Sequence, residues 1–137
     1  MYLVDTSVWS WAWNEPSSRL AQKLIDRLTA GQLATSSVVV LEALHVARNW
    51  DEFSHLSSRL ALLPTVPITA SSGRRALDVQ AQLASAAHGN HRRPAADFLL
   101  AAAAEEAGAD VTLWFFDKDL RVICEHTGQP HEAETRA

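Results

Sequence analysis

The chain opens with Met1-Tyr2-Leu3-Val4-Asp5-Thr6-Ser7-Val8-Trp9, and this stretch decides the fold. The apolar run 2–4 predicts a short strand that is buried on both faces. It stops at Asp5, and the two hydroxyl residues that follow can cap a helix. Asp5 is therefore expected at the carboxyl end of a strand. In an open parallel α/β sheet this edge holds ligands and chemistry, because the loops diverge there and the following helices point their amino termini at the crevice.

The rest of the chain alternates between helical and strand patterns. Further strands are expected at 33–35, at 66–68 and at 111–116. Pro67 allows the second of these only at a sheet edge, because proline removes a ladder donor. The run 111–116 is apolar enough for the centre of the sheet. Helices are expected to begin at Thr6, Ser17 or Ser18, Ser36 or Ser37, Asp51, Ser71 or Ser72, Pro94, and just before Leu120.

This alternation predicts an α/β fold in three layers, with a central, mostly parallel sheet and helices on both faces. Helix should predominate. A length of 137 residues fits a single domain over residues 1–137, in which residues 130–137 read as a polar tail. The sequence shows no internal repeat and no low-complexity linker.

The amino-acid composition excludes several kinds of function for this chain. Hydrophobic residues make up 47% of the chain and charged residues 20%, with no apolar run as long as a membrane span. No secretory signal is visible, so we expect a cytoplasmic protein without a membrane partner. The single cysteine, Cys124, excludes an internal disulfide and a multi-cysteine zinc site. The net charge of −4 argues against a broadly basic surface, but a divalent metal can still bring a phosphodiester to carboxylates.

Four acids are expected to meet at the carboxyl edge of the sheet. Asp5 and Asp117 each end an apolar strand, Asp97 lies in the first turn of the helix that leads to the strand before Asp117, and Glu42 follows another strand. Each acid alone can also be explained without a function, as a helix cap, a partner of the helix dipole or a solvated neighbour. Together they would repel one another, and hard cations such as Mg²⁺ or Mn²⁺ relieve that repulsion. Their coincidence at one edge favours a functional site.

Two other groups of residues offer contacts with a partner. Arg92 and Arg93, directly before Pro94, are candidates for contacting RNA phosphates, or else form a solvated loop. Tryptophans in a helix usually belong to the core. However, three of them at 9, 11 and 13 exceed what one helix face can bury, so at least one is a candidate for a protein contact.

The residues quoted so far resemble the PIN domain family, specifically the VapC-type toxins of bacterial toxin–antitoxin pairs, over nearly the whole chain. The matching segments are Val4-Asp5-Thr6-Ser7-Val8-Trp9, Ser37-Val38-Val39-Val40-Leu41-Glu42, Pro94-Ala95-Ala96-Asp97-Phe98-Leu99-Leu100-Ala101-Ala102 and Asp117-Lys118-Asp119-Leu120. The resemblance implies a metal-dependent endoribonuclease that uses Mg²⁺ or Mn²⁺ and leaves a 5′-phosphate and a 3′-hydroxyl. It further implies an RNA substrate, a VapB-type antitoxin as partner, and a homodimer.

By this resemblance Asp5, Glu42, Asp97 and Asp117 match the acidic quartet, and Asp119 matches a further acid. One position departs from the family pattern. Relatives usually carry Thr, Ser or His two residues before the acid of the last turn, where this chain has Phe115. A polar contact to the fourth acid is therefore expected to be missing, with Thr6 and Ser7 as the remaining candidates for orienting ligands.

Two other functions fit part of the pattern. A catalytically silent α/β interaction module would use the acids only as caps and the tryptophans as its contact surface. A haloacid-dehalogenase-like phosphatase also starts from an Asp at a strand end, but Ser7 stands where its second Asp belongs. A Gly-rich phosphate loop is absent as well, which argues against nucleotide binding.

Overall fold

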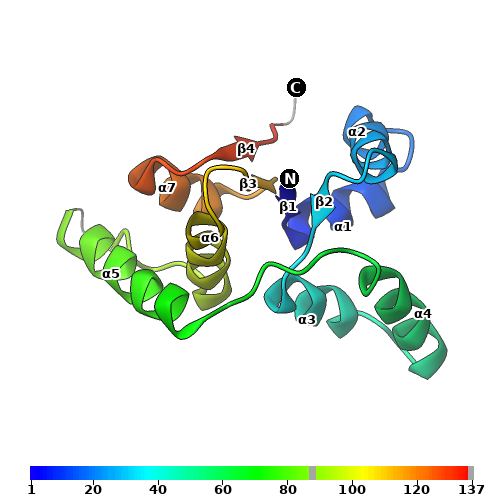
Figure 1. The fold of residues 1–137 in the computed structure, drawn as a ribbon, viewed down its shortest axis with the longest axis horizontal. Coiled ribbons are helices and arrows are strands. Elements are labelled where there is room, and N and C mark those ends of the chain that lie inside the picture. The colour runs from blue at the N-terminus through cyan, green and yellow to red at the C-terminus, as the bar shows by residue number, and fades with distance from the viewer. Residues whose placement is uncertain (87–88, 136–137) are drawn as a thin grey trace.

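The protein is described here from a computed structural model, which covers residues 1–86 and 89–135. Its centre is a sheet of four parallel strands in the order β2-β1-β3-β4 (Figure 1). The strands are β1 Tyr2–Val4, β2 Leu33–Ala34, β3 Thr112–Phe115 and β4 His131–Ala133. The predicted parallel sheet and its helix-rich character are confirmed.

Helices account for most of the described residues. They are α1 Thr6–Asn14, α2 Arg19–Thr29, α3 Ser37–His45, α4 Trp50–Leu60, α5 Ala70–Ala86, α6 Ala95–Ala107 and α7 Lys118–Thr127. The step from β1 to β2 crosses the sheet in the opposite direction to the steps from β2 to β3 and from β3 to β4. Right-handed crossovers therefore place α1 and α2 on one face and α6 and α7 on the other (Figure 1). In the described part of the chain, no helix is both long and apolar enough to span a bilayer.

The register of the two central strands sets the position of the acids. Val4 of β1 lies opposite Trp114 of β3, and the backbone N–H of Asp5 donates to the Trp114 carbonyl at 2.9 Å. Since β1 and β3 are parallel, the residues that follow them leave the sheet at the same edge. Asp5 and Asp117 are therefore brought to one place by strand pairing alone.

The buried core surrounds the sheet and includes residues of α1, α2, α5, α6 and α7. Leu3, Val4 and the segment Leu113–Phe115 are 0% exposed. In α6 the small side chains Ala101–Ala104 are buried as well, none of them more than 4% exposed. Small residues let the helix approach the sheet closely, which fixes the first turn of α6 relative to the strand ends.

Two predictions about strands were wrong: one expected strand is absent, and one strand forms where a polar tail was expected. The expected edge strand 66–68 does not form. Instead a single parallel bridge joins Thr35 to Thr65, and the Val66 N–H donates to the Thr35 carbonyl at 2.7 Å. Proline at 67 prevents the ladder from continuing.

The predicted polar tail 130–137 instead contains β4, which pairs with β3. Its acidic residues are held by α2: Arg27 binds Glu132 through two bonds of 2.7 and 3.0 Å, and Lys23 binds Glu134 at 2.6 Å. Basic side chains that lie 105 to 111 residues earlier in the chain therefore hold this segment. Residues 136–137 of that predicted tail lie outside the part that the structure describes.

Helix starts agree with the sequence to within a few residues. Ser18 caps α2 as expected, with its hydroxyl accepting from the Ala21 N–H at 3.1 Å. The cap of α4 is Asn49 rather than Asp51, because its side chain accepts from the Glu52 N–H at 3.0 Å. The long helix α5 begins at Ala70, close to the predicted Ser71 or Ser72, and is described to Ala86.

Candidate active site

Five carboxylates lie around the carboxyl edge of the sheet, each placed by the start of a helix or by a helix face. Asp5 and Asp117 are the N-caps of α1 and α7, directly after β1 and β3. Asp97 and Asp119 lie in the first turns of α6 and α7, and Glu42 projects from α3. We call Asp5, Glu42, Asp97, Asp117 and Asp119 the acidic cluster. Every acid predicted for the site is in it.

Three acids of the acidic cluster lie close enough together to share one cation. One ligand atom from each of Asp97, Asp117 and Asp119 can be chosen so that all three lie within 4.8 Å of one another. Asp97 is only 7% exposed, and its Oδ2 atom is buried without a hydrogen-bond partner. A buried carboxylate oxygen without a partner is costly unless a cation or a proton satisfies it.

Ser7 ties Asp5 to the neighbouring strand. Its hydroxyl donates to Asp5 Oδ2 and accepts a bond of 2.9 Å from the backbone N–H of Phe116. This single side chain thus joins the loops that follow β1 and β3. In the same way the Thr6 hydroxyl donates to Glu42 Oε1 at 3.3 Å. Both residues were predicted as candidates for orienting ligands, and both contact an acid of the acidic cluster.

The capping bonds of two acids each converge on one carboxylate oxygen. In Asp117, Oδ1 accepts from the backbone N–H groups of Asp119 and Leu120 at 2.7 and 3.0 Å. In Asp5, Oδ2 accepts from the Ser7 N–H at 3.1 Å as well as from its hydroxyl. Capping and cation binding are therefore compatible, because a cap fixes the rotamer while using one edge of the carboxylate.

The acids perturb one another strongly. Burial raises the pKa of Asp97 to about 8, and the neighbouring charges of Asp117, Asp5, Asp119 and Glu42 add to the shift. Burial also raises the pKa of Asp5, with a further contribution from Asp117. The pKa of Glu42 is raised by burial and then by Asp5 and Asp117. Without a cation, the acidic cluster therefore favours retaining a proton near neutral pH.

The donor set fits a hard divalent cation. The acidic cluster offers carboxylate oxygens and no sulfur or imidazole, which is the preference of Mg²⁺ and Mn²⁺. Asp97, Asp117 and Asp119 could hold the ion directly, and Asp5 and Glu42 supply further carboxylates whose charges act on Asp97. The unpartnered Oδ2 of Asp97 is the atom that such an ion would satisfy.

Phe115 does not take a polar role at the site. It is fully buried in β3, and its ring stacks on that of His131 with centroids 5.9 Å apart. The backbone after it is instead held by Ser7, through the bond to Phe116. The departure from the family pattern at 115 therefore coincides with a hydrophobic contact between β3 and β4.

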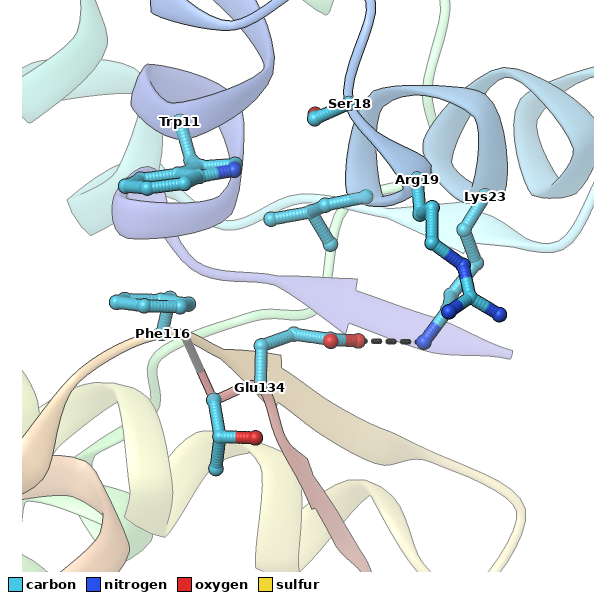
Figure 2. A pocket seen from close by; sticks show the side chains of 8 residues that line it. Trp11, Ser18, Arg19, Lys23, Phe116 and Glu134 are labelled. Atoms are coloured by element: carbon cyan, nitrogen blue, oxygen red, sulfur yellow. Dashed lines mark hydrogen bonds and ion pairs between the residues drawn. The ribbon is translucent and has the colours of Figure 1, made fainter. Parts of the chain in front are cut away.

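The tryptophans of α1 divide between core and surface. Trp9 is buried, Trp11 stacks on Phe116 with centroids 5.1 Å apart, and Trp13 is 47% exposed. Trp11 and Phe116 form one wall of a cavity of about 620 Å³ (Figure 2). Across it Lys23 reaches toward Glu134 (Figure 2). The cavity is lined by Trp11, Ser18, Arg19, Leu20, Lys23, Phe116, Glu134 and Thr135.

The two arginines before α6 have different surroundings. Arg92 is exposed, as a phosphate contact requires. The Arg93 guanidinium is instead paired with Asp119 at 2.7 Å and with Asn90. Sequence reasoning missed this ion pair, because nothing in the local pattern links residues 93 and 119.

The chain has an open parallel α/β sheet that gathers carboxylates at its carboxyl edge, which is where ligands bind in this class of fold. Within that class this chain belongs to the PIN domain family, whose sequence profile matches residues 2–125. The predicted family is thus confirmed.

Two relatives from Mycobacterium tuberculosis (strain ATCC 25618 / H37Rv) are similar over almost their full length. The chain is 34% identical to Ribonuclease VapC18 over 133 residues, covering 96% of this chain and 93% of the relative. It is 35% identical to Ribonuclease VapC51 over 129 residues, covering 94% and 89%.

Solved structures share the fold at lower identity. A DNA-bound VapBC from Salmonella typhimurium superposes with a TM-score of 0.74 at 12% identity, covering 96% of each chain. VapBC2 from Rickettsia felis, bound to a DNA fragment from its promoter, gives a TM-score of 0.67 at 19% identity, covering 98% of each chain.

Proposed function

We propose that this protein is a metal-dependent endoribonuclease that hydrolyses phosphodiester bonds in RNA, and that it is the toxin of a toxin–antitoxin pair. The observation that carries the proposal is the buried, unpartnered Oδ2 of Asp97 at the centre of the acidic cluster. The full-length similarity to relatives named ribonucleases supports the RNA substrate.

We assign the acids to two roles. Asp5, Asp97 and Asp117 bind Mg²⁺ or Mn²⁺, with Asp119 as a further ligand. Glu42, the most exposed of the five, accepts a hydrogen bond from the attacking water and orients it. When bound, such an ion lowers the pKa of a coordinated water and stabilises charge on the phosphate.

The hydroxyl residues and the basic loop complete the proposed site. Ser7 keeps Asp5 in one rotamer, because its hydroxyl is itself held by the Phe116 N–H. The Thr6 hydroxyl donates to Glu42 and restrains that carboxylate. Arg92, which is exposed beside α6, binds a phosphate of the RNA backbone, and Arg93 adds positive charge to the same loop.

The proposed partner is a VapB-type antitoxin, and the proposed setting is the cytoplasm, where the RNA is. Solved structures of the same fold are VapBC assemblies. The chain also exposes large apolar side chains that a partner or a second copy would cover. They include Trp50 at 73%, Leu41 at 71% and Leu77 at 66% exposure. We propose that antitoxin binding and homodimer formation use such surfaces.

The test is cleavage of a fluorogenic structured RNA by the purified protein with Mg²⁺, with Mn²⁺ and with excess EDTA. The variants Asp5→Asn, Asp97→Asn and Asp117→Asn should each lose at least about 100-fold in activity. Asp110→Asn is the matched control, because this exposed acid lies outside the acidic cluster. Folded variants that cleave like the parent, or activity that survives EDTA, would contradict the proposal and favour a silent interaction module.

A further inference from the structure

Arg93 is held on two sides within the part of the chain that the structure describes. Its Nη1 donates to Asp119 Oδ1 at 2.7 Å. Its Nη2 donates to Asn90 Oδ1 at 2.6 Å, and its Nε donates to the Asn90 carbonyl at 3.0 Å. The Arg93 side chain is only 14% exposed and that of Asp119 24%. Such a fork of bonds fixes both the position and the plane of the guanidinium.

This arginine connects two helix starts that carry acids. It directly precedes Pro94, the N-cap of α6, whose first turn holds Asp97. Its partner Asp119 lies in the first turn of α7, which Asp117 caps. The Arg93 side chain therefore links the start of α6, which carries Asp97, to the start of α7, which carries Asp119.

We propose that Arg93 is a positioning residue for the acidic cluster: it holds Asp119 through Oδ1 and thereby directs that carboxylate toward the cation shared with Asp97 and Asp117. This inference rests on the proposed metal site and gives Arg93 a role other than phosphate binding. Asn90 contributes to this positioning, because its carbonyl and side chain both accept hydrogen bonds from the Arg93 guanidinium.

Positioning and simple charge predict opposite results, which makes the inference testable. A positive charge beside a cation site repels the cation, so removal of a charge that did nothing else would tighten metal binding. Removal of a residue that orients a ligand weakens metal binding, typically by about 10- to 100-fold.

The experiment is calorimetric titration of the metal-free protein with Mn²⁺, which needs no RNA and no activity. Arg93→Gln should weaken Mn²⁺ binding by about 10-fold. Asn90→Ala, which keeps the charge but removes the side-chain anchor, should weaken it by a smaller factor. Arg74→Gln, an exposed arginine of α5 that lies outside the acidic cluster and the Arg92 loop, should leave it within about twofold. Circular dichroism of each metal-free variant establishes that it is folded.

A double-mutant cycle tests whether Arg93 affects metal binding through Asp119. In an Asp119→Asn background, Arg93→Gln should have little further effect, because the carboxylate it positions is gone. Unchanged or tighter Mn²⁺ binding by Arg93→Gln would overturn the inference, as would an equal loss with and without Asp119. If the parent binds no Mn²⁺ at all, the proposed metal site itself fails, and this inference fails with it.

Discussion

Replacement of Asp97 by Asn should stabilise the metal-free protein at alkaline pH. Burial and four neighbouring acids raise the pKa of Asp97 from 3.8 to about 8, so the folded state binds a proton that the unfolded chain releases near pH 4. Between these two values the folded state holds more protons, so the free energy of unfolding falls as pH rises. The amide of the Asp97→Asn variant would carry no charge and would remove this dependence.

The size of the effect follows from the linkage relation. Each pH unit inside the window contributes up to about 1.4 kcal/mol for one group. Raising the pH from about 5.5 to 8 therefore costs the parent up to about 3 kcal/mol through Asp97, which corresponds to roughly 10 °C in Tm for a chain of this length. Below pH 4 the carboxyl is protonated in both states, and the penalty disappears.

The assay is thermal unfolding in EDTA at pH 5.5 and pH 8, followed by circular dichroism. The parent and the control Asp110→Asn should lose more Tm between these pH values than Asp97→Asn does. Saturating Mg²⁺ at pH 8 should raise the Tm of the parent and have a much smaller effect on Asp97→Asn. Equal pH dependence in parent and variant, or a variant less stable than the parent at pH 8, would refute the reasoning.

Three further predictions concern the surroundings of the acidic cluster. Ser7→Ala removes the link between Asp5 and the Phe116 N–H, so it should weaken Mn²⁺ binding about 10-fold by calorimetry, whereas Ser10→Ala, an exposed serine of the same helix, should not. Arg27→Lys should cost about 1–2 kcal/mol in urea unfolding, because the Arg27 guanidinium stacks over two aromatic rings at 3.8 and 4.3 Å and binds Glu132 with two bonds. The exposed Arg59→Lys is its control, and equal stability of the two variants would argue against this anchor for β4. Phe115→Leu should cost about 1–2 kcal/mol while Mn²⁺ affinity stays within about twofold, and a larger loss of affinity would mean that this ring acts on the metal site.

The strands and helix caps that depend only on neighbouring residues could be predicted from the sequence. The run 2–4 ends at an acid followed by hydroxyls, which specifies both β1 and the cap of α1. The apolar run before Asp117 specifies β3 in the same way. Once both strands are parallel neighbours, their acids must meet, so the site followed from topology without any contact being known.

Features that depend on distant partners were not predictable. Polar residues at 131–133 form β4 because Arg27 and Lys23 on α2 pair with Glu132 and Glu134, more than a hundred residues away. The link between Arg93 and Asp119 spans 26 residues, across α6 and β3. No periodicity of a single segment contains such information, since a polar strand and a polar tail read alike.

The local helix starts also explain how one edge can carry five acids before any cation binds. Four of the five stand at a helix N-terminus: Asp5 and Asp117 as caps, Asp97 and Asp119 in first turns. Each such position favours a carboxylate by about 0.3–1 kcal/mol through the free N–H groups and the helix dipole. These gains, and the charge of Arg93 on Asp119, offset part of the mutual repulsion. The pKa of Asp97 is raised first by burial and then by the remaining repulsion, and a divalent cation would relieve that repulsion.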